Sequence, residues 1–175
     1  ARQGDLAGVG SESVVVLTSY GWDVSTARRT ELERWVEGGG RLVVDASLIL
    51  GGDVFERWSG IARVVPELTD DDVFDAPEDV CTHVDEIAAG TGVAPSRDLL
   101  ICGVLGGSSL ETSRDPLWGL ADEAGLQVVR MAVGRGSVTA INAEPLRFRD
   151  LLEADHGELF VAATQLASGD RIVFV

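Results

Sequence analysis

The chain has 175 residues, 45% hydrophobic and 25% charged, a composition that excludes both a disordered and a membrane-spanning protein. This length fits one domain, which we expect to cover residues 1–175. Its 29 acidic and 14 basic side chains give a net charge of −15, and every basic one is arginine. Because nucleic-acid binding needs a local excess of cations, nucleic acid is excluded as an expected partner.

The N-terminal part predicts a strand, a helix and a second strand. Val14–Leu17 is a short β-branched run, typical of a strand buried on both faces of a parallel sheet. Ser25 or Thr26 should cap a helix that Gly38–Gly40 ends, and Leu42–Asp45 forms the next strand. The expected apolar face of this helix consists of Ala27, Leu32, Trp35 and Val36. The spacing predicts a right-handed crossover between parallel strands.

The middle of the chain gives weaker signals. Asp53–Glu56 has the spacing of a capping box and precedes a short helix that Gly60 ends. Ile61–Val65 is expected to be a strand. Further along, Val80–Val84 and Leu99–Leu105 have the composition of strands. The acidic stretch between these elements lacks the ligand spacing of a calcium loop and is interpreted as a solvated loop.

The C-terminal part is more regular. Trp118–Ala121, Leu126–Val133 and Ser137–Asn142 are separated by glycine-containing turns and predict an antiparallel meander. Asp155–Glu158 matches a second capping box and opens an amphipathic helix, after which Ile172–Val175 forms a closing strand. The glycine turns of the chain do not open helices, so they predict no phosphate or dinucleotide site, and no cofactor is expected.

Several of these motifs together resemble the DUF4350 family, in a non-catalytic branch of the class I glutamine-amidotransferase-like superfamily. The residues that carry the resemblance are Val14–Leu17, Glu33–Gly40, Arg41–Val44, Gly134–Val138 and Leu151–His156. The resemblance implies an α/β fold, a flavodoxin-like three-layer sandwich whose mostly parallel sheet is extended by the antiparallel meander. It also implies that the chain is a domain cut from a membrane-anchored prokaryotic protein, extracytoplasmic in our expectation, with a cytoplasmic location as the alternative.

Catalysis by a cysteine is the first reaction to test. Active relatives in the wider superfamily carry a G-x-C-x-G turn, whereas Cys102 is followed directly by Gly103 and precedes no helix. The candidate bases are His83 and His156. For His156, a local hydrogen-bonding role is favoured over contact with a ligand. Cys81 and Cys102 have no metal-binding spacing, so no metal site is expected. Free buried thiols are favoured over a disulfide.

Polar residues follow the expected parallel strands and could meet at the carboxyl edge of the sheet, where open α/β sheets bind ligands. They are Ser19, Tyr20, Asp45, Ser47, Asn142, Glu144 and His156. Such a cluster could hold a small polar ligand, or it could serve the backbone of nearby loops, which is the favoured interpretation. Trp22 could add an exposed contact, and together with Tyr20 and Asp45 it could bind a sugar.

These observations favour a non-catalytic domain that binds a small polar ligand or an unknown protein partner. A divergent Cys-dependent hydrolase and a sugar-binding domain are the alternatives. Any membrane association is expected to run through segments that this chain does not contain.

Overall fold

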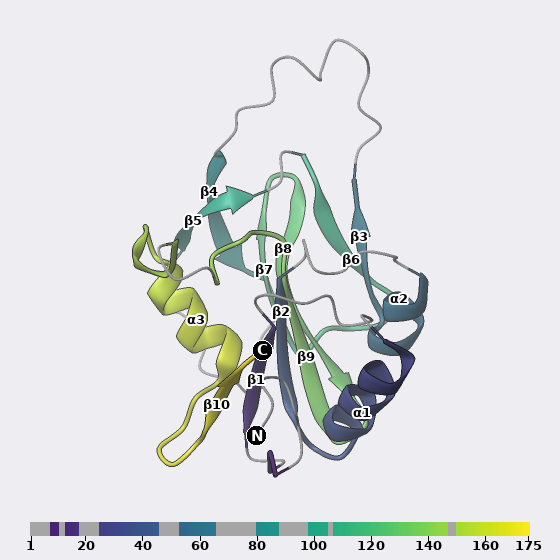
Figure 1. The fold of residues 1–175 in the computed structure, drawn as a ribbon. Helices are drawn as coiled ribbons and strands as arrows, with labels where there is room; N and C mark the ends of the chain where they lie inside the picture. The colour runs from purple at the N-terminus through teal and green to yellow at the C-terminus, as the bar shows by residue number, and fades with distance from the viewer. Residues whose placement is uncertain are drawn as a thin grey trace.

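The computed structural model describes residues 8–10, 13–17, 25–45, 53–65, 80–87, 98–104, 107–146 and 150–175. In this part of the chain, strands outnumber helices, and ten strands join in one mixed, strongly curled sheet (Figure 1). The order along the sheet is β10-β1-β2-β9-β8-β7-β4-β5, with β6 and β3 branching from β8. None of the described helices combines the length and the apolar character needed to cross a bilayer.

One half of the sheet is parallel. It consists of β10 (Ile172–Phe174), β1 (Val14–Leu17), β2 (Arg41–Asp45) and β9 (Gly136–Ile141). β1 and β2 pair in parallel and are joined through helix α1 (Thr26–Glu37), so the predicted strand-helix-strand unit is confirmed. β-branched side chains suit these strands because both faces are covered.

The other half of the sheet is antiparallel. Its strands are β8 (Gly125–Val133), β7 (Trp118–Asp122), β4 (Val80–Glu86), β5 (Leu99–Val104), β6 (Ser109–Thr112) and β3 (Ile61–Val64). β7, β8 and β9 form the predicted meander, which is confirmed. Beyond the end of β9, β6 pairs with β8 through Leu110 and Leu126, and β3 then pairs with β6. The sheet therefore divides where β9 ends.

The prediction of a mostly parallel, flavodoxin-like three-layer sandwich is wrong. The parallel pairs stop at β9, and every other pairing is antiparallel. Among the described residues, the helix between β2 and β3 is the short α2 (Asp53–Ser59), and none occurs from β3 to β9. Here β4 pairs with β5, and β7, β8 and β9 pair in succession, all antiparallel, and the sheet curls instead of forming a flat middle layer.

Two apolar clusters cover the two faces of the sheet. Alternate residues of β1 point to opposite faces, so Val15 and Leu17 join one cluster while Val14 and Val16 join the other. The first cluster includes α1 and α2, with Phe55 fully buried. The second includes α3 (His156–Thr164) and also side chains of β4 and β5. The curled end of the sheet thus shares its core with α3.

Local signals in α1 agree with the structure at both ends. The Ser25 hydroxyl accepts a hydrogen bond from the Arg28 amide at 3.2 Å, which confirms the N-cap. Gly40 follows the helix, and a Cβ there would lie 2.6 Å from the Trp35 ring. Ala27, expected on the buried face, is exposed because it lies in the first turn, ahead of the residues that reach the core.

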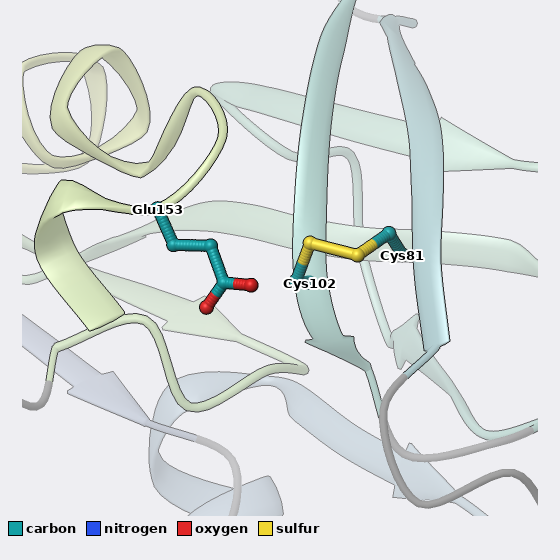
Figure 2. Close-up of side chains that lie close together, drawn as sticks. All are labelled: Cys81, Cys102 and Glu153. Carbon is teal, nitrogen blue, oxygen red and sulfur yellow. A yellow bond between two sulfur atoms is a disulfide. The ribbon is translucent and has the colours of Figure 1, made fainter. Parts of the chain in front are cut away.

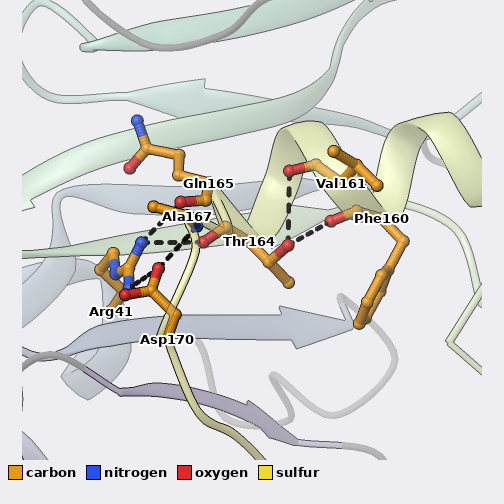
Figure 3. Close-up of polar contacts among 7 residues, drawn as sticks. All are labelled: Arg41, Phe160, Val161, Thr164, Gln165, Ala167 and Asp170. Carbon is orange, nitrogen blue, oxygen red and sulfur yellow. Dashed lines mark hydrogen bonds and ion pairs between the residues drawn. The ribbon is translucent and has the colours of Figure 1, made fainter.

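Two arginines, Arg41 and Arg130, bind the C-terminal end of α3. Arg41 donates to the Gln165 carbonyl and to the Asp170 carboxylate, both at 2.7 Å. Arg130, which is 3% exposed, donates to the carbonyls of Ala162 and Ala163. These carbonyls have no partner within a helix, and cations favour this negative end of the helix dipole. Figure 3 shows the Arg41 part of this attachment.

Candidate functional site

A cavity of about 350 Å³ lies beside β4, at the end of the sheet where β6 branches from β8. Its lining residues are Thr82, His83, Val104, Gly107, Ser108, Asp122, Glu123, Ala124 and Gln127. The volume lies within the range of small-molecule sites, roughly 300 to 1,000 Å³. Six of the nine lining residues have polar side chains, so the cavity offers hydrogen-bonding groups beside an apolar surface.

Behind the cavity lies a buried hydrogen-bonded frame centred on Asn142. The Asn142 amide nitrogen donates to the Ser108 carbonyl at 2.9 Å and to the Gln127 side-chain oxygen at 2.8 Å. Gln127 in turn donates to the Ser108 carbonyl at 3.2 Å. These three residues occupy the point where β8 exchanges its partner β9 for β6. The frame stabilises this change of partner, because its buried polar groups hydrogen-bond to one another.

Asn142 was predicted as a ligand-binding residue at the carboxyl edge. The structure places it at the end of β9, as predicted, but it is fully buried behind Ser108 and Gln127, which line the cavity. Asn142 therefore positions the cavity wall. This agrees with the favoured interpretation that such residues serve nearby backbone.

The cavity wall carries two fixed acid–base elements. Asp122 accepts hydrogen bonds through Oδ1 from the Ala124 amide and from the Gln127 side chain, both at 2.9 Å. His83, in β4, contacts Asp98 through Nδ1 at 2.8 Å, and the two side chains are 68% and 53% exposed. The contact orients the imidazole toward solvent and the cavity. The sequence named His83 only as a possible base for Cys102.

A second polar group lies at the carboxyl edge of the parallel strands. Asp45 ends β2 and is 5% exposed, and Glu144 follows β9. Both carboxylates act on Arg63 of β3: burial lowers the pKa of the Arg63 guanidinium, and the two carboxylates oppose that shift. Arg63 Nε is buried and has no partner among the described residues. The predicted edge cluster thus contains a cation that sequence reasoning missed, because β3 is not a parallel strand.

Four predicted ligand residues cannot be placed. Ser19, Tyr20, Trp22 and Ser47 lie outside the described residues. The sugar-binding alternative depended on Tyr20 and Trp22 beside Asp45, so it stays a prediction.

The expectation of free thiols is wrong, because Cys81 and Cys102 form a disulfide (Figure 2). β4 and β5 are antiparallel neighbours, and this pairing brings the two cysteines together across 21 positions of sequence. The sequence could not show this, since the pairing of the two strands is a tertiary contact. In this state Cys102 carries no thiolate, so it is not available as a nucleophile.

His156 was a candidate ligand or base at the start of the last helix. It is 1% exposed, and its Nε2 accepts a hydrogen bond from the Cys102 amide at 2.8 Å. Its Nδ1 contacts the carbonyl of Asp150. With both ring nitrogens bonded to backbone, the imidazole joins β5 to the start of α3. The preceding Asp155 makes no capping bond and instead accepts from the Leu100 amide, so the predicted capping box is absent while its helix is confirmed.

No family model and no curated protein matches this chain. Among solved structures, it is similar to an exo-β-1,4-mannosidase from an Opitutaceae bacterium, with a TM-score of 0.54 and 19% identity over 86% of this chain and 25% of that one. It is also similar to β-galactosidases from Rahnella sp. (TM-score 0.51, 15% identity, 89% and 23% coverage) and from Bacillus circulans sp. alkalophilus (0.50, 17%, 86% and 22%).

These similarities concern the fold. The chain spans about a quarter or less of the length of the glycosidases that it matches. The curled, mixed sheet that the chain shares with segments of these glycosidases again corrects the expected flavodoxin-like frame. The resemblance to DUF4350 stays a prediction.

Proposed function

We propose that this chain is a non-catalytic domain that binds a small polar ligand in the cavity beside β4. The observation that carries the proposal is the polar lining of a cavity of about 350 Å³ on a rigid buried frame. Preorganised polar groups bind a ligand without the entropic cost of ordering the site. The side chains best placed to contact a ligand are Thr82, His83 and Glu123, which are at least partly exposed on the cavity wall.

The domain is proposed to be non-catalytic because the candidate catalytic side chains are occupied by structural bonds. Cys102 is bonded to Cys81, and both ring nitrogens of His156 are bonded to backbone. Asp122 serves the turn between β7 and β8 through the same oxygen that meets Gln127. None of these groups is arranged as a nucleophile with a base. The protein-partner alternative stays a prediction.

The test is ligand binding by purified protein, followed by NMR of backbone amides. The probes are galactose, mannose, myo-inositol and choline: two sugars suggested by the matched glycosidases, a cyclic polyol and a cation suited to the acidic wall. We expect one class to shift the amides of the cavity residues. Thr82→Val and Glu123→Gln should each weaken that binding by up to about tenfold, the value of one hydrogen bond.

Matched controls lie on β6, away from the cavity. Thr112→Val and Glu111→Gln make the same chemical changes at positions that do not line it. Equal weakening by the control and cavity variants, or no binding of any probe class, would contradict the proposed ligand site. Turnover of nitrophenyl β-galactoside or β-mannoside by the purified chain would contradict its non-catalytic character.

We also propose an extracytoplasmic location in a membrane-anchored protein. The support is the disulfide, since such bonds persist in oxidising compartments and are rare in a reducing cytosol. Acid quenching of cells followed by alkylation with a mass tag measures the state of Cys81 and Cys102. An oxidised pair is expected, and a fully reduced pair in growing cells would contradict the location.

A further inference from the structure

The disulfide lies at an irregularity in the pairing of β4 and β5. Val80 pairs with Val104 and Thr82 pairs with Ile101, so Cys81 faces both Cys102 and Gly103. Gly103 has a φ of +73°, as expected for a β-bulge residue. The Cα atoms of the two cysteines are 3.9 Å apart. The backbone thus keeps both sulfur atoms close together, independently of the bond between them.

The carboxylate of Glu153 lies beside this sulfur pair, and Figure 2 shows it pointing toward Cys102. The two Sγ atoms and a Glu153 carboxylate oxygen all lie within 4.8 Å of one another. Cys81 and Glu153 are exposed, whereas Cys102 is buried. The three groups therefore form a cluster that solvent reaches from one side.

The segment that carries Glu153 is attached to β5 by three hydrogen bonds. The Asp155 amide donates to the Leu100 carbonyl at 3.1 Å, and the Leu100 amide donates to the Asp155 carboxylate at 2.9 Å. The Cys102 amide donates to His156 Nε2 at 2.8 Å. None of these bonds involves a sulfur atom. The position of Glu153 relative to Cys102 is therefore set by contacts that survive reduction of the disulfide.

We propose that the reduced form of this protein binds Zn²⁺ through the thiolates of Cys81 and Cys102 and the carboxylate of Glu153. A dithiol reductant transfers two electrons and two protons to the disulfide, giving two thiols and the oxidised reductant. Zn²⁺ then displaces the two thiol protons and forms two Zn–S bonds and one Zn–O bond. A water molecule completes the tetrahedral coordination that Zn²⁺ prefers.

The dimensions of the cluster suit this ion. Zn–S bonds of about 2.3 Å and Zn–O bonds of about 2.0 to 2.2 Å place the ligand atoms of a tetrahedral site roughly 3.5 to 3.8 Å apart. The two sulfur atoms separate to this distance once the disulfide is reduced, and the Glu153 oxygen, already within 4.8 Å of both, reaches it by side-chain rotation. Thiolates select zinc over calcium or magnesium. Because a disulfide sulfur carries no charge, the metal and the disulfide exclude each other, and zinc binding reports the redox state.

The experiment compares metal binding by the whole chain in its two redox states. Oxidised and dithiol-reduced protein, the latter kept free of oxygen and cleared of reductant, are titrated with Cd²⁺ and then with Zn²⁺. Thiolate-to-cadmium charge transfer in the ultraviolet measures Cd²⁺, and competition with a colorimetric chelator measures Zn²⁺. We expect one ion per reduced chain and no charge-transfer signal from oxidised protein.

Glu153→Gln tests the third ligand, and Glu86→Gln on β4 is its control, since Glu86 is exposed and lies outside the cluster. Loss of a ligand should weaken Zn²⁺ binding at least about tenfold, while the control leaves it unchanged. Equal metal binding by both redox states, or equal affinity of Glu153→Gln and wild type, would overturn the proposal. So would unfolding of the chain on reduction, measured by circular dichroism. Failure here leaves the cavity ligand unaffected, because that ligand is tested with oxidised protein.

Discussion

The attachment of α3 and the wall of the cavity use the same kinds of side chain in opposite ways. At the attachment, Arg130 and His156 are buried and bond to backbone carbonyls and amides. At the wall, His83 is exposed and pairs with Asp98. A buried polar side chain that bonds to backbone stabilises the fold. An exposed polar side chain at the cavity wall is available to a ligand. Stability measurements should separate the two regions.

The largest loss is expected for Arg130→Met. Burial and the repulsion from Arg41 lower the pKa of Arg130 to about 10, yet the guanidinium still bonds two helix carbonyls and the Thr139 hydroxyl. Thr139 still donates to the Ala163 carbonyl, but removing the buried guanidinium from these groups should cost about 3 kcal/mol of unfolding free energy. Chemical denaturation measures it. Arg57→Met, at an exposed position of α2, should change stability by less than about 0.5 kcal/mol. Equal losses of unfolding free energy for Arg130→Met and Arg57→Met would contradict a stabilising role of the attachment of α3.

The two histidines provide a matched pair. His156→Ala leaves the Cys102 amide and the Asp150 carbonyl without their partner and should cost about 2 to 3 kcal/mol. His83→Ala should cost less than about 0.5 kcal/mol, because a contact between two exposed side chains contributes little. Urea denaturation of both variants at neutral pH gives the comparison. If His83→Ala lost as much unfolding free energy as His156→Ala, His83 would also be needed for the stability of the fold.

Asn142→Ala tests whether the frame behind the cavity resembles the attachment of α3. Its removal leaves the Ser108 carbonyl and the Gln127 side chain with fewer partners, for an expected cost of about 1 to 2 kcal/mol. Thr82→Ala, in the wall, should fall within about 0.5 kcal/mol of wild type. Thermal unfolding measures the stability of both variants. Similar losses for Asn142→Ala and Thr82→Ala would contradict the distinction between the buried frame and the cavity wall.

The smallest effect concerns acid stability. Hydrogen bonds from Arg41 and from the Ala167 amide lower the pKa of Asp170. The folded pKa lies below the unfolded value of about 3.9, so this contribution is complete above that value and is lost as pH falls through the folded pKa. The stability difference between wild type and Asp170→Asn should be constant above about pH 5 and shrink below about pH 4. A difference that does not decrease between about pH 5 and about pH 2 would contradict this.

Sequence patterns located elements whose information is local. Ser25 caps α1, the turn after Asp122 joins β7 to β8, and Gly60, with a φ of +79°, ends α2. Each depends on side chains within a few residues of the position concerned. The partners of β3, β4 and β5 were missed for the same reason: their pairing joins distant segments, and the hydrophobic pattern of a strand does not name its neighbour.

The residues of the candidate site also fall into those that the sequence located and those that it missed. Asn142 and Asp45 were located because they follow buried strands, and the structure places both at strand ends. Arg63 beside Asp45, and Asp98 beside His83, gave no signal, since each contact crosses between segments that only the curled sheet brings together.

By itself, the sequence determined the acidic character of the chain, the strand-helix-strand unit around α1 and the meander of β7 to β9. Local propensities and turn residues were sufficient for these. The tertiary structure alone decided that the sheet is mixed and curled and that Cys81 meets Cys102 beside Glu153. It also decided that His156 serves backbone while His83 faces a cavity. These outcomes depend on which distant segments pair, because burial and proximity set the chemistry of a side chain.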